Sequence, residues 1–390
     1  MTSLLLPRQD GSLEHYQLQG MPIARPGTVP TFNRIAYAAA HVVSDPLRDS
    51  DPWGRPAIDW EATMAFRHHL WSLGFRIAEA MDTAQRGMGL AWADAQELIR
   101  RSLAEARSVP GADLACGAGT DHLFPDAARS IEDVISAYEE QIDFVEGEGG
   151  RAIMMASRAL ARIARSADDY RRVYGHILRQ AKDKVVLHWL GDMFDPQLRG
   201  YWGSENFEEA LETVLSIISE NSTKVEGIKI SLLDNAKEVA LRNGLPAGAL
   251  CFTGDDFNYA DLIEGDGQKY SHALLGIFDA VAPSASKALS ALADGDLTTF
   301  RGVIEPTVPL SRKIFEAPTQ YYKAGVVFLA WLNGHQRHFT LPAGLQSARG
   351  LQHYTDIFRL ADRANVLDKP ELAAARMRNF LAVLGVEQAD

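Results

Sequence analysis

The sequence predicts an α/β fold, a closed (β/α)8 TIM barrel with an α-helical C-terminal extension and an N-terminal hairpin. Short apolar runs alternate with longer amphipathic stretches, which is typical of parallel strands joined by helices. There are eight such runs, the number of βα units that closes a barrel. An open doubly wound sheet is the alternative. It usually has a Gly-rich phosphate turn after its first strand, whereas Val43-Ser44-Asp45-Pro46 stands there in this chain.

The elements follow the chain in order. Residues 4–19 form a hairpin pattern with Asp10-Gly11 at its turn. The predicted barrel strands are residues 35–43, 75–81, 113–117, 151–157, 184–190, 225–231, 249–253 and 273–278. Helical patterns between them cover residues 60–73, 92–107, 131–146, 167–182, 207–219 and 235–243, with at most a short helix at 259–264. The tail is expected to be helical at residues 284–293, 297–315, 320–333, 356–364 and 369–383.

These patterns suggest three parts: an N-terminal hairpin and arm over residues 1–30, the barrel over 31–283, and the helical extension over 284–390. Linker composition and low-complexity segments are missing from the sequence, so we expect one compact chain.

The composition narrows the class of protein. Of 390 residues, 46% are hydrophobic and 23% are charged, which is ordinary for a soluble globular protein. The formal charge of −12 argues against binding to a nucleic-acid backbone. The two cysteines, Cys116 and Cys251, provide no disulfide framework and no cysteine-rich zinc site, and each is expected to pack as a small apolar residue. We find no secretory signal and no run of about 20 apolar residues, so we expect a cytoplasmic protein without a membrane partner.

Lys229 is the most informative residue. In the strand pattern 225–231, alternation places Val225, Gly227, Lys229 and Ser231 on one face, away from the isoleucines that suit covering helices. Lys229 should therefore point into the barrel. A buried lysine is costly when charged and unpaired, and a lowered pKa would make its amine uncharged and nucleophilic toward carbonyl carbon. The alternative is a lysine ion-paired at the mouth of the barrel.

Polar residues at the other strand ends provide partners for such an amine, because active sites of βα barrels lie at the C-terminal ends of the strands. Asp82 and Thr83 follow the second strand, His188 lies on the fifth, and Thr253-Gly254-Asp255-Asp256 follows the seventh. These groups have the chemistry for imine formation and proton transfer. Asp255 and Asp256 could instead cap the short helix that follows.

The segment GIKISLLD, which contains Lys229, resembles the Schiff-base strand of the dihydrodipicolinate synthase and N-acetylneuraminate lyase superfamily of class I aldolases. Other segments resemble that superfamily in the same order, over most of residues 33–345: 57–60, 77–85, 185–189, 253–256, 280–283 and 321–344. The resemblance implies a βα barrel, Schiff-base chemistry at Lys229, and a homo-oligomer, commonly a dimer or tetramer.

The chain departs from that superfamily at the groups that would hold pyruvate. The tyrosine position is His188, which we expect to titrate near neutrality and to act directly as acid or base. The Gly-Thr-Thr-Gly-Glu loop is Met81-Asp82-Thr83-Ala84-Gln85, and the arginine after the tyrosine is replaced by residues 191–195. A carboxylate at Asp82 would repel a substrate carboxylate. Carboxylates would instead accept hydrogen bonds from hydroxyl groups.

We therefore predict a lyase or aldolase that forms a Schiff base with a small carbonyl compound, a sugar-derived keto or aldehydo substrate rather than pyruvate. No cofactor is expected. The predicted catalytic residues are Lys229 and His188, and the predicted substrate-binding residues are Asp82, Thr83, Asp192, Thr253 and Asp256.

Two other classes stay open. His188 with Asp82, Asp192 or Asp195 could ligate a divalent metal, which would give a metal-dependent aldolase or isomerase on the same barrel. A catalytically silent sugar-binding barrel is the other. In the loop 192–208, Tyr201 and Trp202 could stack on a sugar ring or simply anchor the loop.

Overall fold

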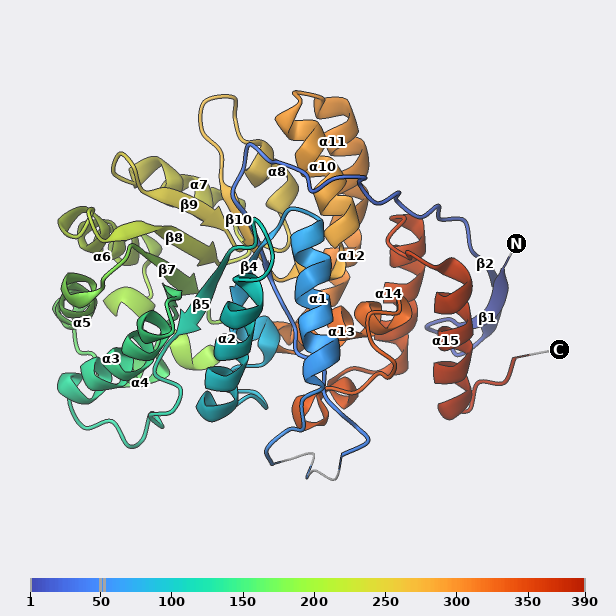
Figure 1. Cartoon of the computed structure of the whole chain (residues 1–390), viewed down its shortest axis with the longest axis horizontal. Coiled ribbons are helices and arrows are strands. Elements are labelled where there is room, and N and C mark those ends of the chain that lie inside the picture. The colour runs from blue at the N-terminus through green and yellow to red at the C-terminus, as the bar shows by residue number, and fades with distance from the viewer. Residues whose placement is uncertain (1, 49–50, 52–53, 389–390) are drawn as a thin grey trace. The chain divides into compact units, whose positions relative to one another are not determined.

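A computed structural model describes residues 2–48, 51 and 54–388 (Figure 1). Eight parallel strands close into a barrel in the order β10-β3-β4-β5-β6-β7-β8-β9, which confirms the predicted TIM barrel. The strands are β3 (Ala36–Ala39), β4 (Arg76–Glu79), β5 (Leu114–Ala118), β6 (Arg151–Met154), β7 (Val185–Leu190), β8 (Val225–Ser231), β9 (Leu250–Thr253) and β10 (His272–Leu275).

The barrel interior is filled by alternate residues of its strands, as the two-residue period of a strand requires. The buried interior cluster consists of Tyr37, Ala39, Ala78, Met81, Ala115, Ile153, Met155, Val186, Phe252 and Leu274. These side chains come from every barrel strand except β8 and from the residues just beyond two of the strand ends, so they mark which face of those strands points inward. The two cysteines are both buried and free, as expected.

An ionic network lies at the strand starts, the end opposite the candidate site. Arg151, the first residue of β6, contacts Asp113 at 2.8 Å, Glu226 at 3.3 Å and the hydroxyl of Tyr37 at 3.0 Å. Arg76 reaches Asp113 at 3.2 Å. These ion pairs connect strands at one end of the barrel, and the candidate site lies at the other end.

Helices follow the strands as predicted, and local signals explain where they begin. Ser130 and Asp133 form a capping box at the start of α3, while the side chains of Asn206 and Asp234 cap α6 and α7. The sequence analysis missed two short helices, α4 and α9 (Ile277–Ala280), and it assigned residues 277–278 to the last strand, which ends at Leu275. The helices of this part are α2 (Trp92–Ala106), α3 (Ile131–Gly147), α4 (Arg158–Ile163), α5 (Ala167–Gln180), α6 (Phe207–Glu220), α7 (Asn235–Gly244) and α8 (Tyr259–Glu264).

The predicted N-terminal hairpin and helical tail are also present. β1 (Ser3–Pro7) pairs antiparallel with β2 (Leu13–Gln17). The predicted helix 297–315 is interrupted at Pro306, whose missing N–H and ring favour a break there. The remaining helices are α1 (Trp60–Ser72), α9 (Ile277–Ala280), α10 (Ala282–Ala293), α11 (Leu297–Ile304), α12 (Val308–Ile314), α13 (Tyr322–Leu332), α14 (Leu351–Arg363) and α15 (Pro370–Val383).

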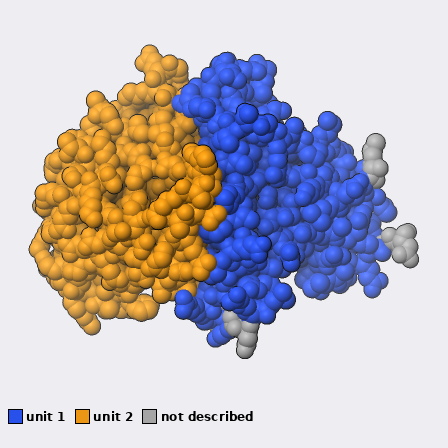
Figure 2. Space-filling view, in the orientation of Figure 1, with its two compact units in different colours: residues 1–33, 41–74, 276–390 blue, residues 34–40, 75–275 orange. Residues whose placement is uncertain are grey.

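The chain forms two compact units, coloured separately in Figure 2. One contains residues 1–33, 41–74 and 276–390, and the other contains 34–40 and 75–275. All eight barrel strands belong to the second unit. The domain boundaries expected from the sequence, 1–30, 31–283 and 284–390, stay a prediction. Among the described residues, no helix has the length and apolar character needed to cross a membrane.

Candidate active site

Lys229 and His188 lie side by side in the barrel. His188 of β7 and Phe252 of β9 are the register partners of Lys229 on either side of β8. Phe252 belongs to the interior cluster, and so does Val186, two residues before His188. Since partners in parallel strands share a face, Lys229 and His188 both point into the barrel.

The environment of Lys229 favours an uncharged amine. The residue is 7% exposed, so its side chain is buried but still reachable. Burial lowers the pKa of Lys229 below its usual range, and this effect outweighs the opposing attraction of the carboxylates of Asp82 and Asp256. Within the described part of the chain, no carboxylate forms an ion pair with Lys229 within 4.0 Å. The structure therefore gives no support to the ion-paired alternative.

His188 has a different character from the one expected. Its ring is fully buried, and burial together with the positive charge of Lys229 lowers the pKa of His188 to about 3. The expectation that His188 titrates near neutrality is therefore wrong: the ring is neutral across the physiological range. Its Nε2 lies 3.3 Å from the hydroxyl oxygen of Ser231, and its Nδ1 has no hydrogen-bond partner among the described residues.

Two residues that the sequence analysis gave no role complete this part of the site. Ser231 is 2% exposed and ends β8 on the same face as Lys229. Gly254 packs directly on both residues, because a Cβ at position 254 would lie 2.2 Å from Ser231 Oγ and 2.7 Å from Lys229 Cε. Only glycine fits there without displacing them. Gly254 is visible in the sequence as part of the Thr253-Gly254-Asp255-Asp256 turn. Its contact with Ser231 and Lys229 could be inferred only once the pairing of β8 with β9 was known.

Asp82, Thr83 and Asp256 are near the lysine or at the same end of the barrel. Asp82 begins a short 3-10 helix, Asp82–Ala84, directly after β4, and Thr83 is 2% exposed within it. The carboxylate of Asp82 partly opposes the lowering of the pKa of both His188 and Lys229. The carboxylate of Asp256 does the same for Lys229. Both carboxylates are thus close enough to influence the amine electrostatically.

Asp255 has the capping role that we considered as an alternative. Its Oδ1 accepts hydrogen bonds from the backbone N–H groups of Phe257 at 2.8 Å and Asn258 at 3.0 Å, and Asn258 Nδ2 donates to Oδ2. Asp255 therefore shapes the turn after β9, while its neighbour Asp256 influences the lysine.

The structure contradicts the predicted substrate-binding role of Thr253. Phe252 points into the barrel, so alternation turns Thr253 outward, where it is fully buried. Its hydroxyl oxygen accepts from the backbone N–H of Asp255 at 3.2 Å. It also contacts Glu238 of α7, a buried carboxyl whose pKa is raised by burial to about 8. Thr253 supports the strand end and does not face Lys229.

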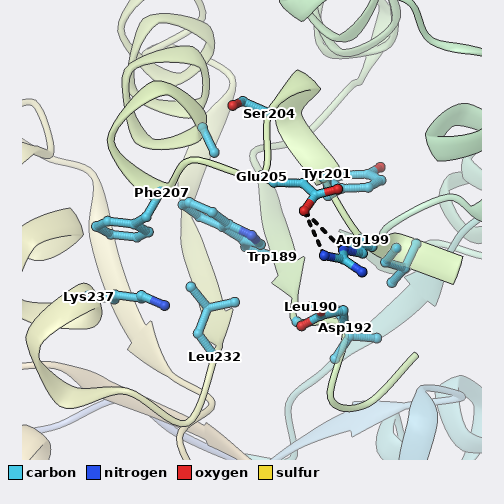
Figure 3. Close-up of a pocket in the computed structure, with 14 residues that line it drawn as sticks. Trp189, Leu190, Asp192, Arg199, Tyr201, Ser204, Glu205, Phe207, Leu232 and Lys237 are labelled. Carbon is cyan, nitrogen blue, oxygen red and sulfur yellow. Dashed lines mark hydrogen bonds and ion pairs between the residues drawn. The ribbon is translucent and has the colours of Figure 1, made fainter. Parts of the chain in front are cut away.

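Asp192 lies apart from the lysine as well. It is exposed and lines a separate pocket of about 200 Å³ beside the end of β7, shown in Figure 3. Trp189, Phe207 and the ion pair between Arg199 and Glu205 lie around that pocket, but Lys229 and His188 do not line it. The loop after Leu190 places Asp192 at this pocket, and its role in substrate binding stays a prediction.

The loop aromatics anchor the chain. Tyr201 is 3% exposed and Trp202 is fully buried, in an aromatic cluster with Tyr170 and Tyr174. The hydroxyl groups of Tyr201 and Tyr174 are 2.9 Å apart. Neither ring is available to stack on a sugar, so the anchoring alternative holds.

The metal alternative gains no support from the donor geometry. Within residues 2–48, 51 and 54–388, no group of three or more histidine, cysteine, aspartate or glutamate side chains is arranged to hold a metal ion. Asp195, one of the candidate ligands, pairs with Arg158 and caps a 3-10 turn.

Lys229 is a buried lysine near the C-terminal end of the sixth strand of a TIM barrel. The protein is therefore a βα barrel with a candidate Schiff-base site. The chain belongs to a family described as a protein of unknown function, DUF993, whose model matches residues 4–386. No curated protein matches the chain.

Solved structures share the fold. Dihydrodipicolinate synthase from Aquifex aeolicus has 11% identity and a TM-score of 0.64, over 86% of this chain and 99% of that one. A putative dihydrodipicolinate synthetase from Pseudomonas aeruginosa has 14% identity and a TM-score of 0.63, over 85% and 99%. Dihydrodipicolinate synthase from Thermotoga maritima has 15% identity and a TM-score of 0.61, over 86% and 99%. The resemblance predicted from the sequence is thus confirmed for the fold.

Proposed function

We propose that this protein is a lyase of the class I aldolase type, which forms a Schiff base between Lys229 and a small carbonyl compound. The observation that carries the proposal is the buried, reachable amine of Lys229, whose pKa is lowered by burial and which has no ion-paired carboxylate within 4.0 Å in the described part of the chain. An amine in this state is the nucleophile that imine formation needs.

The chemistry follows from the groups around the amine. Nζ attacks the carbonyl carbon, and the carbonyl oxygen leaves as water after it has gained protons. The resulting imine, once protonated, accepts electrons from a bond α to the former carbonyl carbon, which can then break or form. Asp82 and Asp256 are the nearby carboxylates that can exchange protons with the substrate during these steps.

The substrate we propose is a sugar-derived keto or aldehydo compound. Asp82 lies in residues 81–85, which resemble the loop that binds a carboxylate in the dihydrodipicolinate synthase superfamily, and it adds negative charge near Lys229. The carboxylate of pyruvate would be repelled by the carboxylate of Asp82. The hydroxyl groups of a sugar can instead donate hydrogen bonds to Asp82 and Asp256. The expectation of a homo-oligomer stays a prediction.

Reductive trapping tests the proposal. The protein is incubated with a panel of small keto and aldehydo compounds, including dihydroxyacetone, glyceraldehyde and pyruvate, and then reduced with borohydride. We expect a mass adduct on the peptide that contains Lys229 with the hydroxylated members. K229A should lose it, whereas K237A, which removes a lysine at the pocket of Figure 3, should keep it.

Dialysis against a chelator distinguishes this proposal from a metal-dependent aldolase or isomerase. Adduct formation at Lys229 should survive the dialysis, since imine chemistry does not need a metal. An unmodified Lys229 peptide across the whole panel would contradict the proposal.

A further inference from the structure

Ser231 lies between the two catalytic candidates. It follows Lys229 by two residues on β8, so their side chains share the inward face. Its hydroxyl oxygen is 3.3 Å from Nε2 of His188 on β7. Both Ser231 and His188 are almost fully buried, so bulk water does not compete for this contact.

Ser231 is also close to the side chain of Lys229. Ser231 Oγ and Lys229 Cε lie 2.2 Å and 2.7 Å from the point that a Cβ would occupy at Gly254. The two atoms can therefore be no farther apart than the sum of those distances. The hydroxyl group thus lies near both the imidazole of His188 and the end of the lysine side chain.

The tautomer of His188 decides the direction of this contact. Nδ1 is buried and has no hydrogen-bond partner among the described residues. A neutral imidazole carries one proton, so a hydroxyl that donates to Nε2 leaves the proton on Nδ1. In that form Nε2, which lies next to the hydroxyl oxygen of Ser231, is the basic nitrogen.

We propose that Ser231 is a positioning residue: its hydroxyl donates to Nε2 of His188, fixes the tautomer with the proton on Nδ1, and carries protons between this ring and the nitrogen of Lys229. This inference rests on the proposed Schiff-base function.

The proton transfers balance without another reactant. Attack forms the N–C bond and moves the carbonyl π electrons onto oxygen, which leaves a surplus proton on Nζ. Ser231 Oγ takes that proton as its own moves to Nε2, and the reverse movement delivers a proton to the carbinolamine oxygen. The nitrogen lone pair then completes the C=N bond as the C–O bond breaks, and the leaving oxygen takes a second proton from the hydroxyl of Ser231 and departs as water. The proton that remains on the iminium nitrogen replaces the one that Ser231 has given, which leaves a neutral imine.

The first test measures the tautomer and needs no substrate. In wild-type protein with 15N-labelled histidine, we expect the ring of His188, assigned with H188Q, to show a protonated Nδ1 and an unprotonated Nε2. S231A should shift this balance and S231T should restore it. A wild-type ring protonated on Nε2 would overturn the proposal, whatever the fate of the Schiff base.

The second test measures the rate of adduct formation at Lys229 by quenching with borohydride, with dihydroxyacetone as the probe. S231A and H188Q should each slow the reaction about a hundredfold or more, the lower end of the usual acid–base contribution. The double variant should be no slower than the slower single variant, because both changes break one relay. S231T should keep most of the rate, and S216A, on the outer helix α6, should be unchanged. S231C replaces S231A if the alanine variant does not fold.

The outcomes separate the two claims. Adduct formation that is equally fast in S231A and wild type would overturn the relay and leave the proposed function standing. Losses that add in the double variant would also overturn it. A wild-type protein that forms no adduct with any member of the panel would remove both claims.

Discussion

His188 and Lys229 are register partners on β7 and β8, and both side chains point into the barrel. The charge of Lys229 contributes to lowering the pKa of His188 to about 3, and burial is the main cause that lowers the pKa of both groups. This pair, together with Ser231, sets the pH behaviour of the site.

The rate of adduct formation should rise with pH and show no inflection near 6.5. A free amine is required, and the pKa of Lys229 lies below its usual value of 10.5, so the rising limb should be centred below 10.5. His188 is neutral throughout, so it adds no limb near neutrality. The measurement is the pH dependence of borohydride trapping between about 5 and 10.

D82N should move that rising limb to lower pH. The carboxylate of Asp82 raises the pKa of Lys229, and its removal lets burial lower the pKa further. D192N serves as the control, because Asp192 lies at the pocket of Figure 3 and should leave the limb in place. A limb that moves to higher pH in D82N would mean that the electrostatic account of the site is wrong.

G254A should slow the reaction of Lys229 and only moderately lower the free energy of unfolding. The new methyl group would lie 2.2 Å from Ser231 Oγ and 2.7 Å from Lys229 Cε, and both are side-chain atoms that can rotate away. We expect a loss of about 1–3 kcal/mol in the free energy of unfolding, as for overpacked sites. Trapping should slow at least about tenfold, comparable to the loss of a positioned group.

G302A is the matched control, because a Cβ at Gly302 of α11 meets nothing within 4 Å. Normal trapping in folded G254A would show that the lysine does not need this glycine.

E238Q should stabilise the protein, and the gain should grow with pH. The folded-state pKa of Glu238 is about 8, against 4.5 for an ordinary glutamate. Between these values the unfolded chain releases a proton that the folded protein retains, so wild-type stability falls as pH rises. Glutamine never ionises. The gain should approach zero below pH 4.5 and increase toward pH 8, by up to about 1.4 kcal/mol per pKa unit of difference.

Urea unfolding of wild type and E238Q at several pH values measures this gain. E212Q changes an exposed glutamate on α6 and should show no such trend. A gain that is the same at pH 4.5 and pH 8 would contradict a neutral, buried Glu238.

The barrel and the direction of Lys229 could be predicted because both depend on short-range pattern: eight apolar runs and the alternation within 225–231. The direction of Thr253 could not, because it depends on how β9 is aligned with β8. The same alignment brings Gly254 onto Lys229 and Ser231. The low pKa of His188 also escaped prediction, since it arises from burial and from a charge on a neighbouring strand.

The most direct test of the central claim is the titration of Lys229 itself, which needs no substrate. Competitive labelling of lysine amines with a trace of acetic anhydride, read by peptide mass at a series of pH values, gives the pKa of each lysine. We expect Lys229 to titrate below 10.5, the ordinary value for a lysine. A Lys229 that titrates at or above 10.5, or that is not labelled at any pH, would contradict a reachable amine of lowered pKa inside the barrel.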